Sequence, residues 1–522
     1  MNHFKIIFES ENKQIFIHEG STILEAAGQA GIIINSSCGG KGTCKKCSVY
    51  IGPDNKKVLA CQYKIESDLK VTIPPESRYF EPKILKYGIS AGNANNDIYA
   101  KYKEITKETK ISGVAVDIGT TSIVTKLLDL ETGKILGTEA TFNPQSQYGD
   151  DVISRISFAE NDENLKILQK SIIDCINTLI KKLCDNLSLA SDSIYELCAV
   201  GNTTMNHIFL GLPIAQLGYS PYKAHSLESY DLSPDQLGLK INPSGNIHTV
   251  ENIAGFVGSD TVAVALAADI DSAANTTLII DIGTNGEIVL GTKDNLYAAS
   301  CAAGPAFEGA GIKCGSRATD GAIEAVVINK DDIDIDVIGN KQAYSICGSG
   351  LIDAVAVMLE LGIIDKTGRF IELEQLKEKL PDAIFKRIKL YNGELALFFT
   401  ENVYVNQGDI RHVQLAKAAI LAGINLLMRQ LGIKPSDIEH VLLAGAFGNY
   451  IRKESALKTG ILPAIAPEKI QFIGNAAASG AQMILLSSEN RIKAKQLAQN
   501  IQYIELANIS DFQDVFTDCL AF

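Results

Sequence analysis

Hydrophobic and polar positions alternate along two short runs near the start of the chain, residues 3–8 and 14–18. A period of two is typical of strands with one buried face, and the polar residues between the runs supply a turn, so a β-hairpin is expected. Residues 21–30 follow with a helical spacing that begins at a capping serine. Two further short strands complete a small β-rich domain, which we predict over residues 1–78.

Residues 79–110 show neither the alternation of a strand nor the spacing of a helix. They are polar, they follow two prolines, and they contain the run Gly-Asn-Ala-Asn-Asn-Asp at 92–97. Such a composition predicts a flexible linker. A flexible chain of this length has an r.m.s. reach of roughly 30 Å, which is enough for a small domain to move between two docking sites.

From residue 111 onward, short apolar runs alternate with long amphipathic stretches such as 165–189 and 413–431. The short runs predict strands and the long stretches predict helices. The expected fold class is therefore a multidomain α/β and α+β protein, in which an N-terminal β-rich domain and a linker precede an α/β body.

Composition excludes several kinds of partner. The 522 residues include 46% hydrophobic and 21% charged positions, with a formal net charge of −13, whereas contact with nucleic-acid phosphates needs an excess of Lys and Arg. Residues 1–13 lack the apolar core of a signal peptide, and the best long apolar stretch, 253–268, is broken by Asp260 and is too short to span a membrane. Eleven unevenly spaced cysteines argue against a disulfide framework and favour a reducing cytoplasm.

Four of the cysteines crowd together with the spacing C-x5-C-x2-C-x13-C. Four thiolates are the ligands that a [2Fe–2S] cluster needs, and the glycines between the first two let backbone N–H groups approach the sulfurs. Those hydrogen bonds, together with Lys41, favour the anionic reduced cluster. The predicted cluster ligands are Cys38, Cys44, Cys47 and Cys61.

Zinc is the competing interpretation, because four cysteines also make a tetrahedral site. Zinc ribbons usually show two C-x2-C pairs, and Cys61 has no paired cysteine, so the spacing favours the iron–sulfur cluster.

Three other cysteines, Cys301, Cys314 and Cys347, could form a second metal or redox site, or they could be buried structural thiols. The small apolar residues around them favour the thiols.

An Asp-Ile-Gly-Thr turn occurs twice, each time between two apolar strands, within residues 114–124 and 278–289. A carboxylate at a strand end can hold Mg²⁺ directly or through water, so Asp117 and Asp281 are the predicted catalytic aspartates. Glycine lets such a hairpin approach a phosphate, while hydroxyls and turn N–H groups bind the phosphate oxygens. The turn residues expected to bind the nucleotide are Gly119, Thr120, Thr121, Gly283, Thr284 and Asn285.

A third glycine turn follows a buried strand within residues 440–450. Such a bend can pass close to a flat adenine ring without a side-chain clash, which predicts nucleotide contacts at Gly445, Gly448 and Asn449. Glu308 is a further catalytic candidate. It could orient an attacking water or anchor a turn, and both interpretations stay open.

The hairpin, helix, cysteine loop and late fourth cysteine resemble a β-grasp [2Fe–2S] ferredoxin of the plant and adrenodoxin type. The three glycine turns, in their order along the chain, resemble the phosphate-1, phosphate-2 and adenosine motifs of the actin, sugar-kinase and heat-shock-ATPase (ASKHA) superfamily. That resemblance implies a two-lobed ATPase domain over residues 111–522, with ribonuclease-H-like sheets and ATP between the lobes. Lobe I would span about residues 111–275 and lobe II about 276–490.

The ASKHA resemblance also implies two connections between the lobes. The first would be residues 198–205, which contain Asn202 as a nucleotide contact, and the second would be residues 472–480. The small-residue run 476–481 in the second is equally typical of close helix packing.

A ferredoxin domain, a linker and an ASKHA domain in one chain together resemble the reductive activators of corrinoid proteins. The resemblance implies ATP-dependent transfer of one low-potential electron from the cluster to a corrinoid, cob(II)alamin to cob(I)alamin, for methyl transfer. The expected cofactors are the [2Fe–2S] cluster, ATP and Mg²⁺. The expected partners are a corrinoid protein of a methyltransferase system and an upstream electron donor, with no nucleic acid and no membrane; a homodimer is left open.

Two other functions stay open. One is ATP-gated electron delivery to a different enzyme, although known dehydratase activators bridge a [4Fe–4S] cluster between two subunits. The other is a redox sensor in which the ATPase fold binds nucleotide without turning it over.

Overall fold

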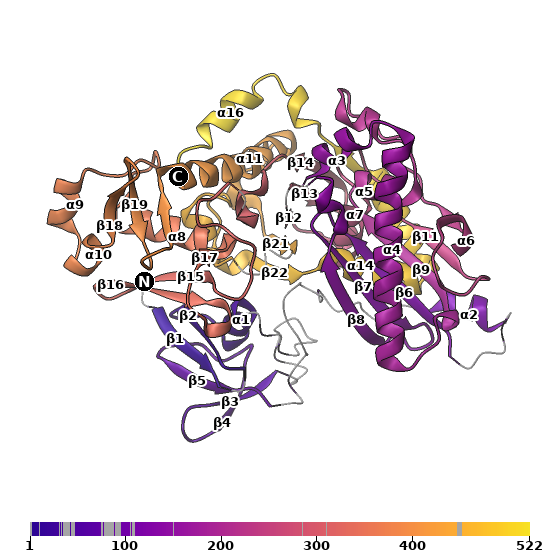
Figure 1. Ribbon diagram of the computed structural model, residues 1–522, viewed down its shortest axis with the longest axis horizontal. Helices are drawn as coiled ribbons and strands as arrows, with labels where there is room; N and C mark the ends of the chain where they lie inside the picture. Colours follow the sequence, from indigo (N-terminus) through magenta and orange to yellow (C-terminus); the bar gives the residue numbers. More distant parts are fainter. Residues whose placement is uncertain are drawn as a thin grey trace.

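Among the residues that the computed structural model describes, the strands form five sheets (Figure 1). The described chain leaves out residues 1–2, 10, 31, 33, 35–41, 43–46, 75–76, 78–87, 89–95, 105, 107–109, 150, 284, 310 and 446–450. One sheet forms the N-terminal domain. Two larger sheets organise the two lobes of the body, and two small sheets extend lobe II.

The N-terminal domain is a mixed sheet with the order β2-β1-β5-β3-β4. Strand β1 pairs antiparallel with β2 and parallel with β5, and alternate side chains of β1 and β2 pack on helix α1. The predicted hairpin and helix are therefore confirmed. The elements are β1 (His3–Phe8), β2 (Lys13–His18), α1 (Ile23–Gln29), β3 (Ser48–Ile51), β4 (Lys56–Leu59) and β5 (Leu69–Thr72).

Lobe I contains a sheet with the order β10-β11-β9-β6-β7-β8. Even-numbered side chains of β6, such as Val114 and Val116, pack on the amphipathic helix α4, because successive residues of a strand point to opposite faces. The elements are β6 (Ser112–Ile118), β7 (Ser122–Asp129), β8 (Ile135–Phe142), α3 (Val152–Phe158), α4 (Asp162–Leu187), β9 (Ile194–Gly201), α5 (Thr203–Leu210), β10 (Asp231–Leu232), α6 (Pro234–Leu237) and β11 (Asn246–Thr249).

Lobe II repeats this plan with the order β22-β21-β12-β13-β14-β23. In both lobes an antiparallel three-strand meander begins with the strand that carries the Asp-Ile-Gly turn, and that strand has a parallel neighbour on its other side. The elements of the sheet and its covering helices are β12 (Thr277–Ile282), β13 (Gly286–Thr292), β14 (Asn295–Cys301), α8 (Gly348–Glu360), α11 (Gln407–Leu431), β21 (His440–Ala444), α13 (Lys453–Lys458), β22 (Ile470–Gly474), β23 (Ile501–Tyr503) and α16 (Phe512–Asp518).

The two small sheets of lobe II have the orders β16-β15-β17 and β18-β19-β20. The first lies beside the N-terminal domain (Figure 1). Their elements are β15 (Ala322–Asn329), β16 (Asp332–Val337), β17 (Ser345–Ile346), α9 (Leu373–Lys379), α10 (Asp382–Phe385), β18 (Ile388–Tyr391), β19 (Glu394–Phe398) and β20 (Tyr404–Asn406).

A central helical layer lies between the two large sheets. Helices α7 (Ser259–Ala267), α14 (Ala476–Leu486) and α15 (Ser488–Asn500) share one hydrophobic core with Ala115 of lobe I and Ile279 of lobe II. A Cβ atom at Gly480 would lie 2.1 Å from the carbonyl oxygen of Ala263. The small-residue run of α14 therefore serves close packing against α7.

This layer shows where the chain crosses between the two large sheets. Residues 198–205 are the end of β9 and the start of α5, so they lie inside lobe I instead of connecting the lobes. The chain passes between the large sheets after α7, and again where β22 leads into α14. Helices α14 and α15 pack beside α7 and share its core.

The predicted linker is also partly structured. Helix α2 (Asp97–Lys103) buries Ile98 and Tyr102, which lie one turn apart on the same helix face, in the core beneath lobe I. The Tyr102 hydroxyl donates a hydrogen bond to Glu196. This end of the predicted linker is therefore anchored on lobe I, because two apolar side chains suffice to dock a short helix within an otherwise polar run. No helix among the described residues is long and apolar enough to cross a membrane.

Candidate functional site

The two Asp-Ile-Gly turns occupy equivalent positions, at the ends of β6 and β12. Asp117 and Asp281 are odd-numbered positions on strands whose odd-numbered apolar residues, such as Ala115 and Ile279, pack on the central layer. Burial raises the pKa of Asp117 to about 6. Burial, and then the charge of Asp117, raise the pKa of Asp281 to about 7. The structure thus brings the two predicted aspartates into one electrostatic site.

Asp260 and Glu287 join these aspartates, although the sequence analysis assigned them no role. Asp260 lies in the first turn of α7, and Glu287 is the cross-strand partner of Asp281. Burial raises the pKa of Asp260, and the charge of Asp281 raises it further. Burial and the charge of Asp260 raise the pKa of Glu287 well above its usual range. The lone charge in the apolar stretch 253–268 was the sequence signal for Asp260.

Four neighbouring carboxylates repel one another, so a divalent cation would stabilise their ionised forms. Nowhere in the described chain do three or more acidic, His or Cys side chains enclose a space that could hold a metal directly.

Three side chains of lobe I hold the first turn in place. Arg155 donates from Nη2 to the carbonyl oxygen of Thr120 at 2.6 Å, and Asn143 donates from Nδ2 to that of Gly119 at 2.9 Å. The predicted contact Asn202 donates from Nδ2 to Thr120 Oγ1 at 2.9 Å and also caps α5. Arg155 is fully buried and had no sequence signal. The turn is therefore fixed before any ligand binds.

The second and third turns meet at Asp281. Gly283 donates its N–H to the carbonyl oxygen of Asn285 at 2.9 Å, which closes the second turn. Gly445 follows β21 with a φ of +83°, and a Cβ atom there would lie 2.3 Å from Asp281 Oδ1. Only glycine allows this approach. The predicted contacts Thr284, Gly448 and Asn449 lie outside the described residues.

The second connection between the lobes also reaches the site. Asn475 donates from Nδ2 to Asp117 Oδ2 at 2.9 Å, and its side-chain oxygen caps α14 by accepting from Ala478 N. The ammonium group of Lys126 faces Asp117 from β7. Burial lowers the pKa of this lysine to about 8, against an opposing effect of the Asp117 charge.

Glu308 and Thr121 make a contact between the lobes. Glu308 ends the short 3₁₀ helix Pro305–Glu308 of lobe II, and the Thr121 hydroxyl of lobe I lies 3.2 Å from both of its carboxylate oxygens. Glu308 therefore lies at the first turn and contacts the other lobe, and its catalytic role stays a prediction.

Cys47 and Cys61 lie together at one end of the N-terminal domain. Both are buried, and their Sγ atoms are 3.3 Å apart. That separation exceeds the roughly 2.05 Å of a disulfide and suits two thiolates on one iron. Gln62 Nε2 lies 3.6 Å from Cys61 Sγ, where it can donate to a cluster ligand. The other predicted ligands, Cys38 and Cys44, lie outside the described residues.

Cys301 and Cys347 are buried and Cys314 is partly buried. Burial raises the pKa of all three thiols. This environment favours packing over redox chemistry.

Family profiles match three parts of the chain. One described as a 2Fe-2S iron-sulfur cluster binding domain matches residues 7–66, one described as the RACo middle region matches 112–273, and one described as the C-terminal domain of RACo, the ASKHA domain, matches 275–522. The corrinoid activation enzyme RamQ of Eubacterium limosum is 32% identical over 586 aligned positions, which cover 98% of this chain and 98% of that protein.

The chain belongs to the family of reductive corrinoid activators. A solved activator in this family, titled the reductive activator for corrinoid,iron-sulfur protein, superposes with a TM-score of 0.72 at 29% identity and covers 99% of this chain and 98% of its own. The [Co(II) methylated amine-specific corrinoid protein] reductase of Methanosarcina barkeri is 27% identical, covering 77% of this chain and 76% of that protein. This corrinoid activator thus combines a [2Fe–2S] domain with a nucleotide-binding ASKHA domain.

Proposed function

We propose that this protein uses ATP to deliver one low-potential electron from its [2Fe–2S] cluster to a corrinoid protein, reducing cob(II)alamin to cob(I)alamin for methyl transfer. The observation that carries the proposal is the joining, in one chain, of a ferredoxin domain to a nucleotide site built around Asp117 and Asp281. Relatives named as a corrinoid activation enzyme and as a Co(II) corrinoid protein reductase support the choice of acceptor.

The need for ATP follows from the difference in reduction potential between donor and acceptor. For one electron, each roughly 59 mV of unfavourable potential lowers the equilibrium constant tenfold. A conformational cycle that contributes about 5 kcal/mol would offset on the order of 200 mV. Nucleotide can supply this only by binding two conformations of the lobes with different affinities. An upstream donor must then return the electron to the cluster.

The nucleotide site would divide its tasks between the lobes. Asp117 and Asp281, with Asp260 and Glu287 behind them, would bind Mg²⁺ through water, while the turn N–H groups bind phosphate oxygens. Mg²⁺ held there would supply positive charge beside the phosphates. Glu308 is placed to orient an attacking water near the first turn, since its carboxylate already accepts from Thr121.

The predicted cluster ligands remain Cys38, Cys44, Cys47 and Cys61. The described pair supports this assignment by its sulfur separation and by the nearby Gln62 amide. A donor to a ligand sulfur stabilises the more negative reduced state and so tunes the potential of the carrier.

Mg-dependent nucleotide affinity should rise with pH. Below about pH 6 the carboxyls of Asp117 and Asp281 are protonated and neutral, and each gains its negative charge as the pH rises through its raised pKa. Cation binding needs the ionised form, so Kd for Mg-ATP should fall at least about tenfold between pH 5.5 and 8. Isothermal titration calorimetry would measure this, with EDTA as the control that removes the pH effect. An affinity that is flat with pH would contradict the assigned site.

The function itself is tested by ATP turnover of the anaerobic protein, with and without a corrinoid protein loaded with cob(II)alamin. We expect the partner to stimulate turnover, and we expect the cob(I)alamin absorption band to grow only when ATP is present. Turnover that the corrinoid protein fails to stimulate would favour another acceptor enzyme. Nucleotide binding without any turnover would favour a redox sensor.

A further inference from the structure

The ferredoxin domain rests on lobe II through a defined set of polar contacts (Figure 1). Lys453 Nζ of α13 lies 3.1 Å from Glu25 Oε1 of α1, a pair separated by 428 residues in the chain. His18 Nε2 of β2 lies 3.4 Å from Glu454 Oε2 of α13. Both contacts come from the first turn of α13. Together they dock the domain on the start of this helix.

The contact extends to β15 and β16, against which β1 and β2 pack. Burial raises the pKa of Glu324 to about 7, and Lys13 of the ferredoxin domain opposes that rise. Asp336 is buried with a pKa raised to about 8, which Lys5 and Lys13 also oppose. Lys5 and Lys13 of the ferredoxin domain thus lie near enough to these two carboxyls of lobe II to favour their ionised forms.

The start of α13 is held rigidly, and it is connected to the nucleotide site. Arg452, which caps α13, forms a buried ion pair with Asp353 of α8 at 2.7 Å. Strand β21 precedes α13 in the chain. Gly445, the residue after β21, lies close to the carboxylate of Asp281. Strand β21 pairs with β22, and Lys453 Nζ lies 5.8 Å from the ring centroid of Phe472 on β22, so described contacts link the Asp281 side of lobe II to the docking residue Lys453.

The linker makes a second contact beside the other aspartate. Gly88 forms an antiparallel bridge with Gly474. A Cβ atom at Gly88 would lie 2.3 Å from the carbonyl oxygen of Asn475 and 2.7 Å from Ser479 Oγ. Asn475 is the residue that donates to Asp117. The linker therefore touches the segment that holds the first aspartate, and only glycine fits at this position.

We propose that these two contacts form a latch which docks the ferredoxin domain, and that the latch is coupled to the nucleotide bound between Asp117 and Asp281. One contact lies where β22 leads into α14, beside Asn475, and the other lies on α13 of lobe II, so a nucleotide-driven shift of Asn475 and Asp117 would act on the first contact directly. The latch coincides with the lobe arrangement in which Thr121 reaches Glu308. In this proposal docking favours the lobe arrangement in which Thr121 contacts Glu308, and separation of the lobes frees the domain to deliver its electron, a role that rests on the proposed function.

Coupling between two equilibria is reciprocal. If nucleotide binding favours docking, breaking the latch must lower the affinity for nucleotide of the lobe arrangement in which Thr121 contacts Glu308 by the same factor. We expect Lys453→Glu and Gly88→Ala each to raise Kd for a nonhydrolysable ATP analogue roughly fivefold. The exchanged pair Glu25→Lys with Lys453→Glu should restore the affinity. Glu9→Lys is the matched control, because Glu9 pairs with Lys70 on an exposed face of the same domain.

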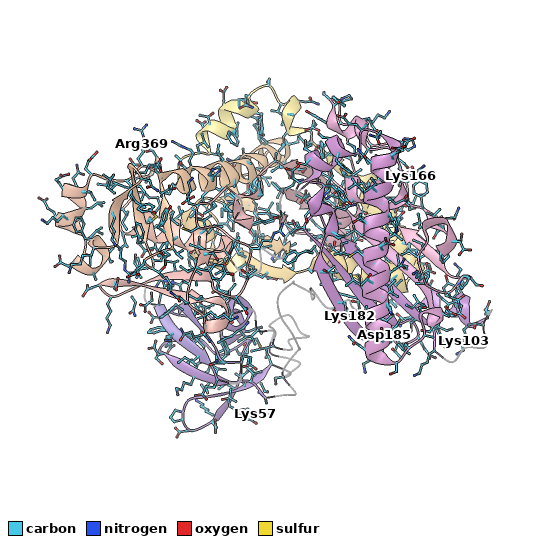
Figure 2. The ribbon with its side chains drawn as sticks, viewed as in Figure 1. Lys57, Lys103, Lys166, Lys182, Asp185 and Arg369 are labelled. Atoms are coloured by element: carbon cyan, nitrogen blue, oxygen red, sulfur yellow. The ribbon has the colours of Figure 1, made fainter. Side chains whose placement is uncertain are left out.

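Docking is measured directly in the full-length holoprotein by the distance between spin labels on noncanonical residues at positions 57 and 369, both exposed (Figure 2). With the analogue bound, we expect a narrow distribution for the wild type, the control and the exchanged pair, and a broad one for the two latch variants. The latch would be overturned if Lys453→Glu left the distance distribution or Kd unchanged. It would also be overturned if the exchanged pair failed to restore them. Neither readout needs a corrinoid protein, so failure of the proposed function is seen separately as absence of cob(I)alamin.

Discussion

Replacing Asp281 with alanine is expected to lower ATP turnover roughly 10²–10³-fold, a loss typical of removing one preorganised electrostatic group from an active site. Asp281 lies where the second and third glycine turns meet, and its charge interacts with those of Asp117, Asp260 and Glu287. Its loss would remove a cation contact from lobe II while leaving the ferredoxin domain untouched. Turnover is measured by phosphate release, and the visible spectrum of the cluster should be unchanged.

Asp185→Ala is the matched control for this experiment, because Asp185 is an exposed aspartate on α4 (Figure 2). It should turn over ATP at the wild-type rate. Asp117→Ala should behave like Asp281→Ala, with an added effect on Asn475, which loses its acceptor. An Asp281→Ala protein with full activity would exclude this residue from the site.

Replacing Cys47 with serine is expected to abolish the visible-absorbing cluster and to reduce electron delivery to the level of the cluster-free protein. Cys47 is fully buried beside Cys61, so no other described thiol can take its place. Nucleotide binding should persist because the ASKHA domain has its own core. Iron content, the absorption spectrum and nucleotide Kd measure the three outcomes.

Cys175→Ser provides the matched thiol control, since Cys175 is a partly buried cysteine on α4 of lobe I. It should keep both the cluster and the electron delivery. Wild-type protein that holds one zinc and no iron after anaerobic reconstitution would contradict electron transfer altogether.

The latch gives the linker a specific mechanical role. Helix α2 anchors one end of this segment on lobe I, and Gly88 is held at the connection between the lobes. The freedom available to the ferredoxin domain therefore depends on whether Gly88 stays in place. A domain that undocks only when the lobes separate would meet its acceptor at a defined point of the ATP cycle, which limits loss of the electron to other oxidants.

Local patterns in the sequence determined the elements and most of the chemistry. Alternating positions in β1 and β2, the helical spacing of α4 and the repeated Asp-Ile-Gly turn depend on neighbours a few residues apart, and a short stretch of sequence is enough to show them. The spacing of the four cysteines is likewise visible within a short stretch of sequence. Such features marked the pair of aspartates, and they carried the resemblances that implied a ferredoxin domain and two lobes.

The tertiary structure alone decided which distant groups meet. Asp260 and Asn475 reach the aspartates because α7 and α14 pack between the two sheets, and Arg155 supports Thr120 from a separate helix. That packing places α14 beside α7, and a separate contact between the ferredoxin domain and α13 brings Glu25 to Lys453. These proximities depend on how whole layers stack, and residue spacing along one chain carries no record of that stacking.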